Sequence, residues 1–252
     1  MTDASVGTGQ AGLRFDGIGK IFPDGTEALA DVSFSVSKGE FVTVVGPSGC
    51  GKSTLLRIAS GLERQTSGHC YVDREHLGYV FQDATLLPWR TVQRNVQLFA
   101  ELHKIPEAVR TQRVDESLAL VGLTGFERHY PRQLSGGMRM RVSLARSLVL
   151  SPPLFLFDEP FGALDEITRE RLNEETLALF ASEGFASLFI THSIMEAVFM
   201  STTVHVMSAR PGRIVATYEI PFDYPRKPEL RFEPGFAHLS GEINQSLRGA
   251  HA

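Results

Sequence analysis

Cysteine and tryptophan are scarce in this 252-residue chain, which has two cysteines and one tryptophan. Two cysteines cannot supply the disulfide framework of a small secreted domain, so we expect a protein kept in a reducing compartment. The first residues carry neither the basic nor the apolar segment of a secretory signal. The sequence also lacks any apolar run near the roughly 18 residues that cross a bilayer. If a membrane matters, the chain is expected only to touch it.

An excess of positive charge is absent as well. The chain has 25 lysines and arginines against 29 aspartates and glutamates, which gives a net charge of −4. This balance argues against nucleic acid as the main partner, because binding a polyanion needs a basic surface. The 42% share of apolar residues is that of an ordinary globular protein, and the length fits one large domain or one domain with a smaller lobe.

Short apolar runs alternate with amphipathic segments along most of the chain. The run 40–46 (EFVTVVG) has the pattern of a strand buried on both faces of a parallel sheet. The alternation predicts helices on both faces of such a sheet, with a second, helical lobe between two strand regions. Residues 69–73 and 77–82 are interpreted as a short hairpin. The strands are expected at 34–36, 40–46, 69–73, 77–82, 153–159, 186–192 and 202–208, and the helices at 52–61, 91–103, 107–121, 137–150, 166–182 and 193–200.

The segment GPSGCGKS (46–53) fits the phosphate-binding pattern G-x-x-x-x-G-K-[ST] between a predicted strand and a predicted helix. Its glycines let backbone N–H groups converge on phosphate oxygens, the helix N-terminus adds its dipole, and Lys52 adds a cation. Ser53 is the expected Mg²⁺ ligand, and Cys50 is expected to be small filler. The alternative is a glycine-rich turn that only caps a helix. The predicted nucleotide-contacting residues are Gly46, Pro47, Ser48, Gly49, Cys50, Gly51, Lys52, Ser53 and Thr54.

Two adjacent carboxylates end the apolar run PLFLFDEP (153–160). Successive side chains of a strand point to opposite sides, so Asp158 and Glu159 are expected to act differently. We predict that Asp158 belongs to the Mg²⁺ site and that Glu159 is the base facing a water beyond the γ-phosphate. The alternative is an acidic strand end that caps the next helix.

The segment LSGGMRMRVSLARSL (134–148) sets a serine and two glycines before a predicted helix, which forms a second anion site. Alone, such a segment is often only a capped helix. Together with YVFQD, GALD and ITH, it completes six motifs whose order over about residues 13–215 resembles that of the nucleotide-binding subunit of ABC transporters. The resemblance implies an ATPase that uses ATP and Mg²⁺. It also implies a P-loop NTPase (RecA-like) α/β core with an N-terminal antiparallel β lobe and an inserted helical subdomain at about 91–150.

The resemblance divides the chain and assigns further roles. The ATPase domain covers 13–220, between a leader at 1–12 expected to be disordered and a short tail at 221–252. Gln82 matches the Q-loop glutamine, expected to touch Mg²⁺ or the attacking water. His192 matches the switch histidine that approaches the γ-phosphate, and Phe22 matches the aromatic residue that stacks on adenine. Catalysis is thus expected from Glu159, His192, Lys52 and Gln82.

The resemblance also implies a homodimer. The signature residues Ser135, Gly136 and Gly137 are expected to contact the γ-phosphate bound to the opposite subunit, and Asp165 in GALD is expected at the dimer interface. Met138 stands where many family members have glutamine. Only 30 residues separate Lys52 from Gln82, some ten fewer than we expect, so the antiparallel lobe should be trimmed near 71–78.

The segments 81–98 and 158–169 and the tail resemble the ATP-binding subunits of the nitrate, sulfonate and taurine importers. This resemblance implies a peripheral protein on the cytoplasmic face of the inner membrane, with a polytopic permease and, through it, an extracytoplasmic solute-binding protein. Trp89 is expected where the subunit meets the permease, or else as a hydrophobic plug. The alternatives are a soluble non-transport ABC ATPase such as a cluster-assembly ATPase, a subunit that has lost hydrolysis, and a small-molecule kinase.

Overall fold

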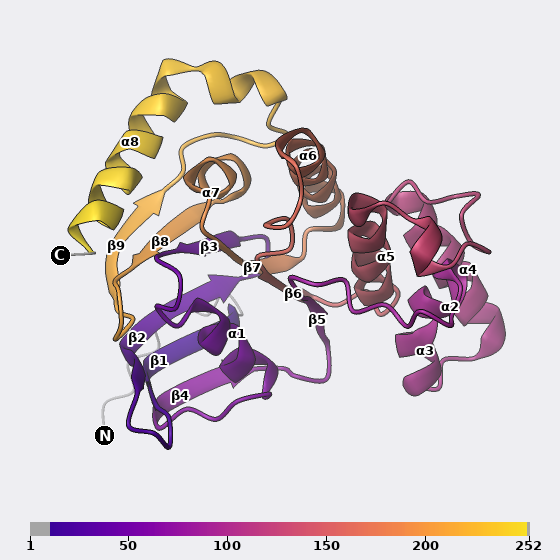
Figure 1. Cartoon of the computed structure of the whole chain (residues 1–252), viewed down its shortest axis with the longest axis horizontal. Helices are drawn as coiled ribbons and strands as arrows, with labels where there is room; N and C mark the ends of the chain where they lie inside the picture. Colours follow the sequence, from indigo (N-terminus) through magenta and orange to yellow (C-terminus); the bar gives the residue numbers. More distant parts are fainter. Residues whose placement is uncertain (1–10, 251–252) are drawn as a thin grey trace, which may run out of the picture.

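Two sheets organise the chain, of which the computed structural model describes residues 11–250 (Figure 1). The smaller sheet is antiparallel, with the strand order β2-β1-β4. The larger sheet has the order β5-β6-β7-β3-β8-β9, and its pairs are parallel except β8 with β9. The strands are β1 (Ala11–Ile21), β2 (Glu27–Ser37), β3 (Phe41–Val45), β4 (Ser67–Val72), β5 (Leu77–Val80), β6 (Leu154–Asp158), β7 (Ala186–Thr191), β8 (Thr203–Met207) and β9 (Ile214–Glu219).

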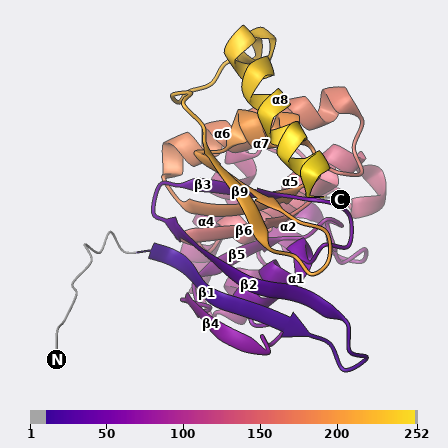
Figure 2. The same cartoon turned by 90° about the vertical axis from the view of Figure 1, so that its left-hand side faces the viewer.

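The larger sheet is covered on both faces, as its apolar strands predict. All five residues of β3 are buried. Val42 and Val44 pack in a core shared with the antiparallel sheet and α1 (Lys52–Ser60), whereas Phe41 and Val45 pack in a second core on the opposite face. That face is covered by α6 (Glu166–Glu183), α7 (Ile194–Met200) and α8 (Pro234–Gly249) (Figures 1 and 2). The two cores confirm a strand buried from both sides.

A helical subdomain is inserted between β5 and β6 and lies to one side of the sheets (Figure 1). The predicted helix 91–103 is instead two short helices that meet at Gln97, and the other two predictions hold to within two residues. Buried apolar side chains of α2, α4 and α5 join the second core, which fixes the subdomain to the sheet. The helices are α2 (Val92–Val96), α3 (Leu98–Leu102), α4 (Glu107–Leu120) and α5 (Gly136–Leu148).

The hairpin predicted at 69–82 is wrong. Strand β4 pairs with β1 in the antiparallel sheet, whereas β5 pairs in parallel with β6 in the other sheet. The four residues between them therefore carry the chain from one sheet to the other. Tyr79 and Val80 are buried by this pairing, which a two-stranded hairpin would not achieve.

The C-terminal segment is packed against the core. Phe236 and Ile243 on α8 are fully buried. Before this helix, the Arg226 guanidinium donates to the carbonyls of Val198 and Phe199 at the end of α7, at 3.1 and 2.9 Å. The hydroxyl of Tyr224 donates to the next carbonyl, that of Met200, at 2.6 Å. The tail thus caps α7. Within residues 11–250, no helix is long and apolar enough to cross a membrane.

Candidate nucleotide-binding site

The P-loop lies at the carboxyl end of β3 and opens a cavity of about 520 Å³. Gly51 has a φ of 109°, and a Cβ there would lie 2.8 Å from the carbonyl oxygen of Ala28, so a side chain would clash. The loop can therefore approach β2 closely and aim the N-terminus of α1 into the cavity. The cavity is lined by Phe22, Asp24, Thr26, Ala28, Ser48, Gly49, Gly51, Lys52, Ser53, Thr54, Gln82, Glu159 and Arg210.

Lys52 is held inside the P-loop by backbone carbonyls. Its side chain is only 4% exposed, and Nζ donates to the carbonyls of Gly46 and Pro47 at 2.9 and 3.0 Å. The same atom lies 3.6 Å from Oε1 of Glu159. The cation is thus placed beside the predicted base, where a phosphate could exchange for these carbonyls.

Ser53, which lines the cavity, and Asp158, which is hydrogen-bonded to it, form a pair of possible oxygen ligands for a metal. The Ser53 hydroxyl donates to Oδ1 of Asp158 at 2.7 Å, and the Tyr79 hydroxyl donates to Oδ2 at 3.2 Å. Burial and the Asp158 charge raise the pKa of Tyr79, so it stays a hydrogen-bond donor. Among the described residues, no group of three or more His, Cys, Asp or Glu could hold a metal. Such a sparse hard-oxygen set fits Mg²⁺, which usually takes one or two carboxylates together with phosphates and water.

Glu159 and His192 face each other from adjacent strand ends. Oε2 of Glu159 lies 2.9 Å from Nδ1 of His192, although 33 residues separate them. Glu159 has a φ of 45°, which is unusual for a residue with a side chain, and its N–H donates to the carbonyl of Ile190 at 3.0 Å. The strained turn directs the carboxylate toward the P-loop.

The remaining predicted residues divide between two places. Phe22 and Gln82 line the nucleotide cavity, but Ser135 and Gly137 line a separate cavity of about 350 Å³ beside α6. Asp165 is exposed and caps α6 by accepting from the N–H of Thr168 at 3.0 Å. Within one chain, the signature residues therefore do not reach the P-loop.

Arg210 was missed by sequence reasoning. It lies in the turn between β8 and β9 and donates to the carbonyl of Gly49 through both Nε and Nη2, at 3.2 and 3.0 Å. Gly212 ties this turn to β2 through backbone hydrogen bonds with Ala28 and Ala30. The only signal available from the sequence was an arginine next to a Pro-Gly turn.

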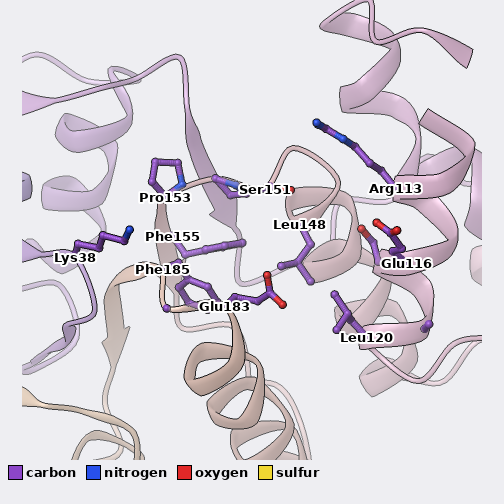
Figure 3. Close-up of a pocket in the computed structure, with 14 residues that line it drawn as sticks. Lys38, Arg113, Glu116, Leu120, Leu148, Ser151, Pro153, Phe155, Glu183 and Phe185 are labelled. Atoms are coloured by element: carbon purple, nitrogen blue, oxygen red, sulfur yellow. The ribbon is translucent and has the colours of Figure 1, made fainter. Parts of the chain in front are cut away.

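A larger cavity of about 770 Å³ lies between the helical subdomain and the sheet (Figure 3). Its walls are mostly apolar, with Leu120 on α4 facing Leu148 and Phe185. None of the P-loop residues lines it, and its two carboxylates, Glu116 and Glu183, are exposed. Nucleotide chemistry therefore belongs to the smaller, more polar cavity.

A P-loop beside a strand-end carboxylate pair, with a helical subdomain carrying a second glycine-rich helix start, defines the class of ABC-type P-loop ATPases. The family model described as "ABC transporter" matches residues 29–162, and the chain belongs to this family. The chain is thus an ATP-binding ATPase subunit, and the predicted fold class is confirmed.

The chain is similar to named import ATP-binding proteins and to solved ABC cassettes. The nitrate import ATP-binding protein of Synechococcus elongatus is 43% identical, over 99% of this chain and 96% of the relative. The aliphatic sulfonates import ATP-binding protein of Bacillus cereus is 42% identical, over 85% and 88%. Among structures, a dimeric bacterial ABC transporter cassette matches with a TM-score of 0.73 at 31% identity, over 84% of this chain and 100% of the cassette. The cbiO1 protein of Clostridium perfringens matches with a TM-score of 0.78 at 26% identity, over 96% and 98%. The resemblance to the nitrate and sulfonate group is thereby confirmed.

Proposed function

We propose that the chain is the ATPase of an ABC importer, in which two copies bind two ATP·Mg²⁺ and drive a separate permease. The observation that carries this proposal is that Lys52 and Glu159 line one P-loop cavity and lie close together, with His192 in contact with Glu159. Phosphoryl transfer depends mainly on positioning and on neutralising charge, which this set of groups can provide.

Each group has a distinct proposed task. Glu159 orients the attacking water and accepts its proton. His192, hydrogen-bonded to Glu159, contacts the γ-phosphate. Lys52 exchanges its carbonyl partners for phosphate oxygens, and Gln82 reaches the same water. Ser53, Gln82 and Asp158 would hold Mg²⁺, which supplies charge neutralisation between phosphate oxygens when bound. Phe22 stacks on adenine, since its half-buried ring lines the mouth of the cavity.

A second copy completes the proposed site. The signature residues lie outside their own chain's nucleotide cavity, on a helix start whose N–H groups suit an anion. A head-to-tail pair would bring Ser135, Gly136 and Gly137 of each copy to the other copy's γ-phosphate. Asp165, exposed beside them, would lie in the same interface. The dimeric cassette structure supports this arrangement.

Trp89 supports a permease contact. Its side chain is 71% exposed, although tryptophan is usually covered, and the buried Asn95 fixes the loop that carries it by hydrogen bonds to Leu87 and Arg90. A rigid loop that presents a bare aromatic ring suits a protein interface. The protein would then lie at the cytoplasmic face of the inner membrane, with a solute-binding protein reached through the permease. The relatives' names favour nitrate or a sulfonate as the solute.

The test is to purify the tagged chain from its own cells in mild detergent and to identify the proteins that co-purify with it. The ATPase rate is then measured with these proteins present and after their removal. A polytopic membrane protein that raises the ATPase rate is the expected result. A soluble partner alone, even after crosslinking, would contradict the importer proposal and favour the cluster-assembly alternative.

Arg210→Ala is expected to raise the Kd for ATP about fivefold and to leave kcat nearly unchanged. The guanidinium donates two hydrogen bonds to the Gly49 carbonyl and adds positive charge beside the proposed phosphate site. Neither effect takes part in proton transfer. Titration with a fluorescent ATP analogue measures the change. Arg210→Lys should recover part of the affinity, and exposed Arg213→Ala is the matched control from the same turn. Equal affinities of Arg210→Ala and wild type would remove Arg210 from the site.

A further inference from the structure

Glu196 is a buried carboxylate outside the nucleotide cavity. It lies in the first turn of α7, four residues after His192, and is 6% exposed. Its Oε2 accepts a hydrogen bond from the hydroxyl of Thr191, and that hydroxyl accepts one from the N–H of Ser193 at 3.0 Å. The hydroxyl of Ser193 in turn accepts from the N–H of Glu196 at 3.3 Å. Glu196 thus fixes both residues that flank His192.

The other carboxylate oxygen of Glu196 faces α6. Oε1 lies 3.8 Å from Nε of Arg169, and it has no hydrogen-bond partner among the described residues. Burial raises the pKa of Glu196, whereas Thr191 and Arg169 act in the opposite direction. A buried carboxylate is costly unless it is well paired, and an apolar residue of similar volume would often give equal or greater stability. A contribution to the stability of the fold therefore does not by itself account for this buried carboxylate.

Arg169 connects this carboxylate to the 161–165 turn that follows Glu159. Its Nη2 donates to the carbonyl of Leu164 at 2.8 Å, and its Nε donates to the carbonyl of Phe161 at 3.3 Å. The exposed Asp165 ends the turn and caps α6. Arg169 therefore contacts, on one side, the turn expected to meet a second copy and, on the other side, Glu196.

The side chain of His192 has few contacts of its own. The side chain is 53% exposed, and among residues 11–250 its ring has one hydrogen-bond partner, Glu159. Gly162 of the 161–165 turn comes close to it, since a Cβ there would lie 3.6 Å from Cε1 of His192. The backbone on either side of His192 must therefore set the direction of the imidazole.

We propose that Arg169 and Glu196 are positioning residues, through which a shift of the 161–165 turn changes the orientation of His192. When a second copy contacts this turn, Arg169 moves together with the carbonyls of Phe161 and Leu164, to which it is hydrogen-bonded. Glu196 moves with Arg169 and, through its hydrogen bond to Thr191, keeps His192 in contact with Glu159. The inference rests on the proposed function, because it concerns ATP hydrolysis in a dimer. It adds an intramolecular link between the dimer face and the hydrolytic residues.

Two substitutions break the link at different points. Glu196→Gln keeps the shape but removes the charge that faces Arg169, and Thr191→Val removes the hydroxyl that joins Glu196 to the His192 turn. Each is expected to lower kcat about tenfold and to leave KM for ATP within about twofold, because the nucleotide contacts stay in place. The double variant should be no slower than the slower single variant, since both break one link. Thr191→Ser, which restores the hydroxyl, should recover most of the rate.

The matched control is Glu174→Gln. Glu174 pairs with Arg231 at 2.9 Å, and Arg231 stacks on Phe199 at the far end of α7, so this pair also joins α6 to α7. Glu174→Gln should leave kcat unchanged. Wild-type kcat in Glu196→Gln, or losses that multiply in the double variant, would overturn the inference. Failure of the proposed function would look different, because the wild-type chain itself would hydrolyse no ATP or would bring down no permease.

Discussion

Glu159→Gln is expected to bind ATP as tightly as the wild-type chain and to hydrolyse it at least about 100 times more slowly. Glutamine has the same shape but cannot take the proton of the attacking water. The groups expected to hold phosphate are the P-loop and Lys52, whose hydrogen bonds to Gly46 and Pro47 do not involve Glu159. Loss of the repulsion between carboxylate and γ-phosphate favours the ATP-bound dimer. Phosphate release measures the rate, and size-exclusion chromatography with ATP detects the dimer.

Glu183→Gln is the control for this experiment. Glu183 is an exposed carboxylate at the far end of α6, on the larger cavity rather than the nucleotide cavity. The Glu183→Gln variant should hydrolyse ATP at the wild-type rate. If Glu159→Gln also turned over normally, Glu159 would not be the base, and the short contact with His192 would need another explanation.

Arg226→Ala is expected to lower the free energy of unfolding by about 3 kcal/mol. The guanidinium is 8% exposed and donates to the carbonyls of Val198, Phe199 and Phe222. It also lies over the ring of Tyr224, 4.2 Å from its centroid. Alanine would remove the side-chain donor from the buried carbonyls of Val198 and Phe199 near the end of α7. Urea denaturation followed by circular dichroism measures the change.

Arg213→Ala is the matched control for stability. Arg213 is exposed, and its side chain makes no hydrogen bond within residues 11–250. Its effect should stay within about 0.5 kcal/mol. If Arg226→Ala were equally mild, water would have to replace the guanidinium at the end of α7, and the tail would contribute little to the fold.

Local motifs predicted the strand, loop and helix around the P-loop correctly, because this part of the fold is set by residues next to one another in sequence. The order of strand, glycine-rich loop and helix at 40–61 is found as predicted, with Gly61 as the C-cap of α1. Glu159 was predicted from the carboxylate pair at its strand end, whereas His192 could be assigned only through the family pattern, since nothing local says that the two side chains meet. Arg210 escaped because its role depends on a backbone contact between distant segments.

The errors in the predicted elements have different causes. A four-residue apolar run such as β5 cannot reveal that its neighbour is β6, more than 70 residues later, rather than β4. Strand β1 was not predicted because glycines interrupt its pattern, and its register with β2 shifts between Phe15 and Ile18. Helix α8 was overlooked within a tail rich in proline. Its apolar stripe, with Phe236 and Ile243, is buried only by the finished sheet.

The position of β3 between β7 and β8 sets the order in which the chain can be built during synthesis. Both partners of the P-loop strand come from the last third of the sequence, and the first of them begins more than 140 residues after the end of β3. Until then β3 has two open edges and apolar faces, the features that favour aggregation and chaperone binding. A nascent chain therefore has the phosphate-binding motif long before it has a phosphate-binding site, and ATP cannot assist its early folding.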